Sequence, residues 1–240
     1  MTGVQTCALP ISIRVVDVII GRGASGATQT LVIGELTGSN TITGLNNHCI
    51  GYASGSSLTS GGNNTFFGKS AGSAVTTGSF NTIIGTSNGS LITTATDSVS
   101  IGYSVLNGGN NSYCVAIGNE SLKQIVGNAN TSIGASSFRE ATSGALNVAL
   151  GYEAGRLTST SGNNVSCDNS VLLGALTKVN ATGQTNQIVI GYNAVGLGSN
   201  TTVIGNNSTI LTALSGSTII RSEEHTSELQ SLRHLVCRLL

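Results

Sequence analysis

The chain of 240 residues carries very little charge, few aromatic residues, no tryptophan and a single proline. Charged residues make up 8% of it, and the 10 basic and 10 acidic side chains give a formal net charge of zero. Because proteins bind phosphate backbones through clustered Lys and Arg, this balance argues against nucleic acid as a partner. No apolar run reaches the length of a membrane span, so we expect no membrane insertion.

The sequences at both ends of the chain resemble translated DNA adapter. Residues 221–231 read RSEEHTSELQS and residues 234–240 read HLVCRLL, which resembles the in-frame translation of a widely used sequencing-library adapter. Residues 1–11 resemble the partner adapter read from a GTG start codon. We therefore expect residues 1–12 and 221–240 to be adapter-derived and not natural, and residues 13–220 to be the natural repeat region.

Without these ends the chain has three cysteines, one histidine and no proline. Cys49, Cys114 and Cys167 are too few and too scattered for a disulfide framework or a metal site, and we expect small buried side chains. Residues 21–26 match the dinucleotide pattern Gly-x-Gly-x-x-Gly, but the chain then leads into another strand instead of the helix that this fingerprint requires. We expect neither a cofactor nor a metal.

The abundant residues recur in a fixed order. The chain holds 33 glycines, and at twelve points a large apolar residue, the anchor, is followed directly by glycine after a short β-prone run. Successive glycines lie 13, 17, 17, 17, 17, 16, 16, 17, 23, 17 and 14 residues apart, a period that predicts a repeat protein. The pairs are Ile20-Gly21, Ile33-Gly34, Ile50-Gly51, Phe67-Gly68, Ile84-Gly85, Ile101-Gly102, Ile117-Gly118, Ile133-Gly134, Leu150-Gly151, Leu173-Gly174, Ile190-Gly191 and Ile204-Gly205.

Each repeat is expected to contribute one strand. A β-branched residue stands two positions before most anchors, and this period of two predicts that both point to the same face, the core. The residue between them then points to the opposite face, which is also largely apolar and must be covered, most economically by another copy of the chain. These intermediate residues are Cys49, Phe66, Ile83, Ala116, Ala149, Leu172, Val189 and Val203.

Repeats of about 17 residues without a helical period predict an all-β fold, a parallel β-solenoid or β-roll of about twelve short rungs stacked about 4.8 Å apart. The glycine supplies a conformation that a side chain would obstruct. The asparagine before the strand suits a tight turn or a stacked amide ladder. The 23-residue interval between Gly151 and Gly174 predicts an inserted loop around residues 159–168.

Three segments carry the same motif, namely residues 81–85 (NTIIG), 147–155 (NVALGYEAG) and 186–194 (NQIVIGYNA). They resemble the Asn-Thr-Ala-Ile-Gly-Tyr-x-Ala-Gly repeats of bacteriophage tail fibres, and the resemblance spans about residues 18–209. It implies a homotrimeric fibre segment of the virion tail that supports host attachment, with a host surface glycan or protein as a further partner. The repeats are also similar to the heads of trimeric autotransporter adhesins, which would place the chain on the bacterial cell surface.

A carbohydrate-degrading tailspike is the enzymatic alternative, because it would share a solenoid fold. Such an enzyme needs two carboxylates placed across a glycosidic bond. The available carboxylates fall at scattered phases of the repeat, so we expect surface or turn residues, no catalytic residue and no enzymatic activity. They are Asp17, Glu35, Asp97, Glu120, Glu140, Glu153 and Asp168.

Four of the five tyrosines, Tyr52, Tyr103, Tyr152 and Tyr192, directly follow an anchor glycine. Aromatic rings at one phase of a repeat can form a strip on which sugars stack. The same phase also suits stacking between rungs or across a trimer. We favour the structural interpretation and keep these tyrosines as a candidate surface or stacking strip.

Overall fold

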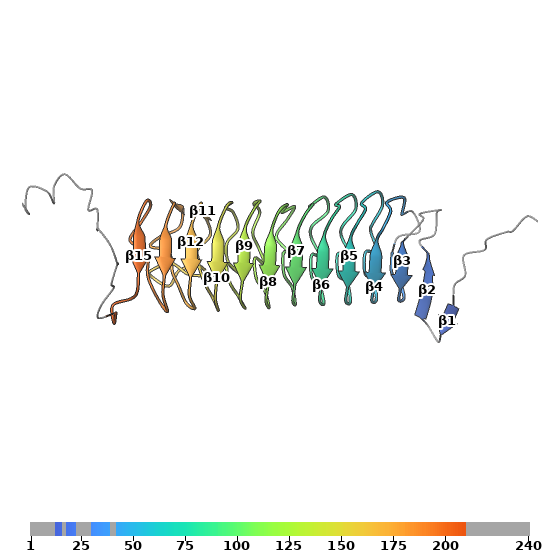
Figure 1. Cartoon of the computed structure of the whole chain (residues 1–240), viewed down its shortest axis with the longest axis horizontal. Helices are drawn as coiled ribbons and strands as arrows, with labels where there is room; N and C mark the ends of the chain where they lie inside the picture. Colours follow the sequence, from blue (N-terminus) through green and yellow to red (C-terminus); the bar gives the residue numbers. More distant parts are fainter. Residues whose placement is uncertain (1–12, 16–17, 23–29, 39–41, 210–240) are drawn as a thin grey trace, which may run out of the picture. The chain divides into compact units, whose positions relative to one another are not determined.

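The computed structural model describes residues 13–15, 18–22, 30–38 and 42–209, and in these residues it is all-β, without a helix. All of the strands belong to one unit, Met1–Ser208, and form a thirteen-stranded sheet and a two-stranded sheet (Figure 1). Nearly all of the second unit, Thr209–Leu240, lies outside the described residues. The predicted adapter segments 1–12 and 221–240, Asp17 and residues 23–26 also lie outside them.

Eleven strands of the large sheet run parallel and lie side by side in a row (Figure 1). Their register places each anchor beside the next, with Ile50 opposite Phe67 and Phe67 opposite Ile84. Eleven parallel strands delimit ten turns of a β-solenoid, whose length is about 48 Å at the usual strand spacing. They are β3 (Leu31–Ile33), β4 (His48–Ile50), β5 (Thr65–Phe67), β6 (Thr82–Ile84), β7 (Val99–Ile101), β8 (Val115–Ile117), β9 (Thr131–Ile133), β10 (Val148–Leu150), β12 (Val171–Leu173), β14 (Ile188–Ile190) and β15 (Thr202–Ile204).

The N-terminal end of the sheet departs from the repeat. Strand β1 (Ile13–Val15) pairs antiparallel with β2 (Val18–Arg22), and β2 pairs antiparallel with β3, so that Ile20 lies opposite Ile33. The prediction of a rung at Ile20-Gly21 was therefore wrong, and the solenoid has eleven parallel strands instead of twelve. The 13 residues between Gly21 and Gly34 are the shortest interval in the series, and antiparallel pairing requires no circuit around the coil.

The predicted inward and outward faces of the strands are reversed. The middle residue of each parallel strand of the large sheet from β3 to β14 is buried in the core, for example Cys49, Phe66 and Ile83, which are 0–1% exposed. The anchors and their partners two positions earlier face outward, and Phe67 is 54% exposed. A three-residue strand presents one side chain on one face and two on the other. The narrow interior of the coil accepts the single side chain, and the open outer surface takes the two.

The asparagines before the strands form a buried amide ladder, which decides between the two predicted roles. Asn64 Nδ2 donates to Asn47 Oδ1 (3.0 Å) and to the Gly78 carbonyl (2.9 Å). Asn64 Oδ1 accepts from the backbone N–H (2.9 Å) and from Nδ2 (3.1 Å) of Asn81. The same pattern joins Asn130 to Asn147. Backbone groups that face the core are thereby satisfied without water.

The anchor glycines are required by close stacking of the turns. Gly51 has a φ of +126°, and a Cβ there would lie 2.6 Å from the Gly68 carbonyl oxygen of the next turn. The parallel register repeats this contact along the sheet, so a side chain at the strand end would separate adjacent turns. The prediction that a side chain would be obstructed at this position is confirmed.

The core exchanges volume between two positions of each turn. Where the inward strand residue is large, as at Phe66, the residue four after the anchor glycine is glycine, because a Cβ at Gly72 would lie 2.9 Å from the Phe66 ring. On the turns of β7 to β9, where the inward residue is Ser or Ala, the same loop position carries a large residue. Ser132 is accompanied by Phe138, and Ala116 by Leu122, all fully buried. On the turns of β5 to β9 the interior is thus filled by one large side chain from either side of the coil. At β10 the inward Ala149 is accompanied by Gly155, where a Cβ would lie 2.6 Å from the Phe138 ring of the preceding turn.

The inserted loop is shorter than the predicted 159–168. Its turn is closed by the Thr158 N–H, which donates to the Gly162 carbonyl (2.8 Å), and by a bridge between Leu157 and Asn163. Residues after this turn rejoin the stack, because β11 (Cys167–Asp168) pairs in parallel with β13 (Gln184–Thr185). The additional residues therefore form a small exposed turn on an otherwise regular coil.

Candidate interaction face

The outer strand face consists of the first and third residues of the eleven parallel strands, 22 residues in all. Because their registers match from β3 to β15, these side chains stand in two continuous rows along the sheet. Seventeen are Ile, Leu, Val or Phe, four are Thr and one is His48. Leu150 and Ile204 are 48% and 45% exposed. This is a long apolar surface open to solvent.

None of the 22 side chains is Asp, Glu, Lys or Arg. Soluble monomers rarely expose a contiguous apolar patch of more than a few hundred Å², and larger ones mark interaction sites. The sequence predicted apolar residues on both faces of the strands and the need to cover the second face, but from β3 to β14 the residues predicted to point outward are the ones that are buried.

The four candidate tyrosines lie at one phase of the coil but on separate turns. They follow β4, β7, β10 and β14, and their exposed fractions range from 45% at Tyr52 to 65% at Tyr192. Three turns separate Tyr52 from Tyr103, about 14 Å at the strand spacing, which is too far for direct contact between the rings. On the turn after Tyr52, the same position is occupied by Lys69, whose Nζ lies 6.0 Å from the Tyr52 ring centre.

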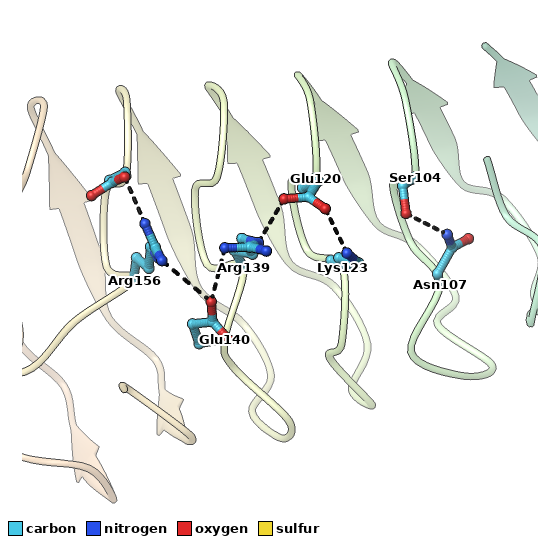
Figure 2. A network of polar contacts seen from close by, with 8 residues as sticks. Ser104, Asn107, Glu120, Lys123, Arg139, Glu140 and Arg156 are labelled. Atoms are coloured by element: carbon cyan, nitrogen blue, oxygen red, sulfur yellow. Dashed lines mark hydrogen bonds and ion pairs between the residues drawn. The ribbon is translucent and has the colours of Figure 1, made fainter. Parts of the chain in front are cut away.

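Three of the scattered carboxylates meet in an ion-pair network on the loops (Figure 2). Glu120 contacts Arg139 Nε (2.7 Å) and Lys123, Arg156 bridges Glu153 (2.6 Å) and Glu140 (3.5 Å), and Arg139 also contacts Glu140 (3.2 Å). The hydrogen bond from Lys123, helped by the charge of Arg139, lowers the pKa of the Glu120 carboxyl. The carboxylates are thus paired with cations across successive turns.

This network was not predicted from the sequence, although a signal for it existed. Lys123, Arg139 and Arg156 each stand five residues after an anchor glycine on three consecutive repeats, and Glu120 and Glu153 stand two residues after one. A shallow groove of about 490 Å³ runs beside it, lined by residues that include Leu91, Asn107, Lys123 and Gln124. Asn107 is held by the Ser104 hydroxyl (Figure 2) and by the Ser87 carbonyl.

The three central cysteines are buried and unpaired, as expected. Burial raises the pKa of the Cys49 and Cys167 thiols to about 12 and also raises that of Cys114. Within the described ranges, no group of three or more His, Cys, Asp or Glu side chains is placed to hold a metal ion. The same residues contain no helix long and apolar enough to cross a bilayer.

Comparison of the chain with protein-family models, with curated proteins and with solved structures finds no match.

Proposed function

We propose that the chain is a structural and adhesive segment of a bacteriophage tail fibre, that it assembles as a homotrimer through the outer strand face, and that it supports attachment of the virion to its host. In this proposal it spaces or presents a host-binding element and is not an enzyme. The observation that carries the proposal is the uncharged apolar face along all eleven parallel strands. The resemblance of the repeats to tail-fibre sequences supplies the fibre context.

Another copy of the chain is the occupant that best fits this face. A stable protein interface uses about 20–30 residues a side, and the outer strand face offers 22. A partner must also supply apolar side chains at the spacing of the strands over ten turns. A second copy supplies this surface by construction, and the absence of charge on the face removes electrostatic repulsion between identical surfaces.

The assembly is tested by sedimentation equilibrium of the full chain. We expect a trimer, and we expect Ile117→Lys with Ile133→Lys to give monomers, because association would bury two unpaired charges per copy. Thr94→Lys, an exposed position away from the strands, is the matched control and should leave the trimer intact. A monomeric parent chain at tens of micromolar would refute assembly through this face.

The fibre context is tested by reading the genomic locus beyond both ends of the repeat region. Virion genes and a chaperone-like domain downstream would support a tail fibre. A coiled-coil stalk followed by a membrane-anchor domain would assign the chain to a bacterial adhesin instead.

A further inference from the structure

One turn position, five residues before the anchor glycine, has a left-handed backbone on every turn from β4 to β15. The φ values at these ten residues lie between +52° and +63°. We refer to them as the turn column. They are Asn46, Asn63, Phe80, Asp97, Tyr113, Ala129, Leu146, Asn169, Asn186 and Asn200.

Hydrogen bonds between turns impose this conformation. The backbone N–H of the nine residues from Asn63 to Asn200 donates to a carbonyl of the preceding turn, as from Phe80 to Gly62 (3.0 Å), from Tyr113 to Thr96 (3.0 Å) and from Leu146 to Asn128 (3.2 Å). Because one turn stacks on the next, a residue in the column cannot relax to a negative φ without breaking this bond. The residue type at this position therefore has to be compatible with the positive φ that stacking on the preceding turn imposes.

Six of the ten residues are Asn or Asp, which tolerate the left-handed region well. The asparagines also bond to one another along the column, Asn46 Nδ2 to Asn63 Oδ1 (3.1 Å) and Asn186 Nδ2 to Asn200 Oδ1 (3.0 Å). Asparagine is therefore the residue that the coil by itself favours at this position.

Phe80, Tyr113 and Leu146 are unfavourable here in two respects. They are large side chains held at φ near +60°, and they are 60%, 64% and 61% exposed. They occupy every second turn, and the smaller Asp97 and Ala129 occupy the turns between them. Strain and exposure at the same residues indicate a gain elsewhere, because such backbone outliers concentrate at functional sites.

We propose that Phe80, Tyr113 and Leu146 contact a second copy of the chain and fix its register along the outer strand face. This inference rests on the proposed assembly. The turn column borders the face, since each of its residues lies two positions before the first outward strand residue, as Phe80 does before Thr82.

The strand face alone is a poor determinant of register, because its rows of Ile, Val and Thr differ little from one turn to the next. Copies displaced by one turn would bury almost the same surface, and uniform sheet surfaces are prone to such slippage. Large side chains on alternate turns distinguish the correct register. If the partner were displaced by one turn, the large Phe80, Tyr113 and Leu146 would be level with the turns that carry its smaller Asp97 and Ala129.

The test replaces the three residues by the asparagine that the column otherwise prefers, in the full chain with Cys7→Ser and Cys237→Ser. For Phe80→Asn/Tyr113→Asn/Leu146→Asn we expect a higher melting temperature of the monomer at low concentration. The backbone strain is relieved, and the side-chain hydrogen bonds between asparagines of the turn column are extended to these turns. We also expect the dissociation constant of the oligomer to rise at least about tenfold, because three apolar contacts are lost. Ala129→Asn relieves strain in the same column without removing a large side chain, and it should leave association unchanged.

Register is read by disulfide trapping in a mixture of two variants, Thr131→Cys and Val148→Cys, which lie on adjacent turns of the outer strand face. Each variant adds one surface cysteine to a chain whose three remaining cysteines are buried. We expect same-residue cross-links in the parent and additional Thr131→Cys to Val148→Cys cross-links in the triple variant. An oligomer of the triple variant with unchanged affinity and a single register would overturn the inference while leaving the proposed assembly in place. A monomeric parent would refute both.

Discussion

At the scale of single residues, the buried asparagine ladder is the strongest determinant of the turn geometry. We expect Asn64→Ala to lower the free energy of unfolding by about 2–4 kcal/mol, because the Asn81 N–H and the Gly78 carbonyl lose their partners inside the core. Urea denaturation at a fixed protein concentration measures the loss. The exposed Thr94→Ala should stay within about 0.5 kcal/mol of the parent. An equally small effect for Asn64→Ala would mean that the ladder does not stabilise the coil.

Gln187 occupies the ladder position in the turn of β14, but it is not an asparagine and does not join the ladder through its side chain. It is fully buried, and neither atom of its side-chain amide has a hydrogen-bond partner among the described residues. Gln187→Asn would place the amide where Asn47 and Asn130 donate to the carbonyl three residues earlier. We expect a gain of about 1 kcal/mol in the free energy of unfolding, since an unsatisfied buried group is removed. Gln187→Ala separates this gain from simple deletion of the amide, and an Asn variant no more stable than the Ala variant would contradict the explanation.

The sequence predicted the residues that recur but not the direction in which they point. The spacing of the anchor glycines predicted short parallel strands, and the asparagines suggested the ladder, because both follow from local backbone chemistry. The inward direction of Phe66 and the outward direction of Phe67 could not be read from a strand that is apolar on both faces. That choice depends on the width of the closed coil, which is a tertiary property.

At the scale of the single turn, the exchange of volume between strand and loop predicts a compensating pair of substitutions. Leu122→Gly should cost about 3–5 kcal/mol through loss of a buried side chain, and Ala116→Ile about 1–3 kcal/mol through overpacking. The double variant reproduces the arrangement of Ile83 with Gly89 in the turn of β6. We therefore expect a favourable coupling of about 1–3 kcal/mol in a double-mutant cycle of unfolding free energies.

Ala116→Ile combined with Leu58→Gly provides the control for this cycle, because Leu58 fills the core several turns away. Substitutions without shared partners should add within about 0.5 kcal/mol. Additivity in the adjacent pair as well would show that the two positions do not compete for one space.

Elements that break the repeat were the hardest to predict. Strand β2 pairs antiparallel with β3, so the chain reverses direction here instead of making a circuit of the coil. Ile20-Gly21 has the same sequence pattern as the true anchors, so the pattern did not predict this difference. The ion-pair network depends on contacts between turns, so its carboxylates looked scattered along the sequence. Both follow from which segments become neighbours after folding, which periodicity alone does not specify.

At the scale of the whole molecule, charge and apolar surface occupy different parts of the coil. Within the described residues, the outer strand face has no Asp, Glu, Lys or Arg, whereas the ion-pair network lies on the loops of β8 to β10. Association through the strand face should therefore depend on burial of apolar surface, and salt should act mainly on the loops. Exposed ion pairs lose most of their interaction at 1 M salt, where the screening length is about 3 Å.

This separation predicts how the oligomer responds to solution conditions. We expect the dissociation constant measured by sedimentation to change less than about threefold between 0.05 and 1 M NaCl, and to fall in sodium sulfate, which strengthens apolar burial. The variant Glu120→Gln/Glu140→Gln/Glu153→Gln, which removes the carboxylates of the network, should associate as the parent does. Dissociation at high NaCl would instead show that polar contacts hold the copies together. The interface would then have to lie on the loops, and the outer strand face would need a different partner.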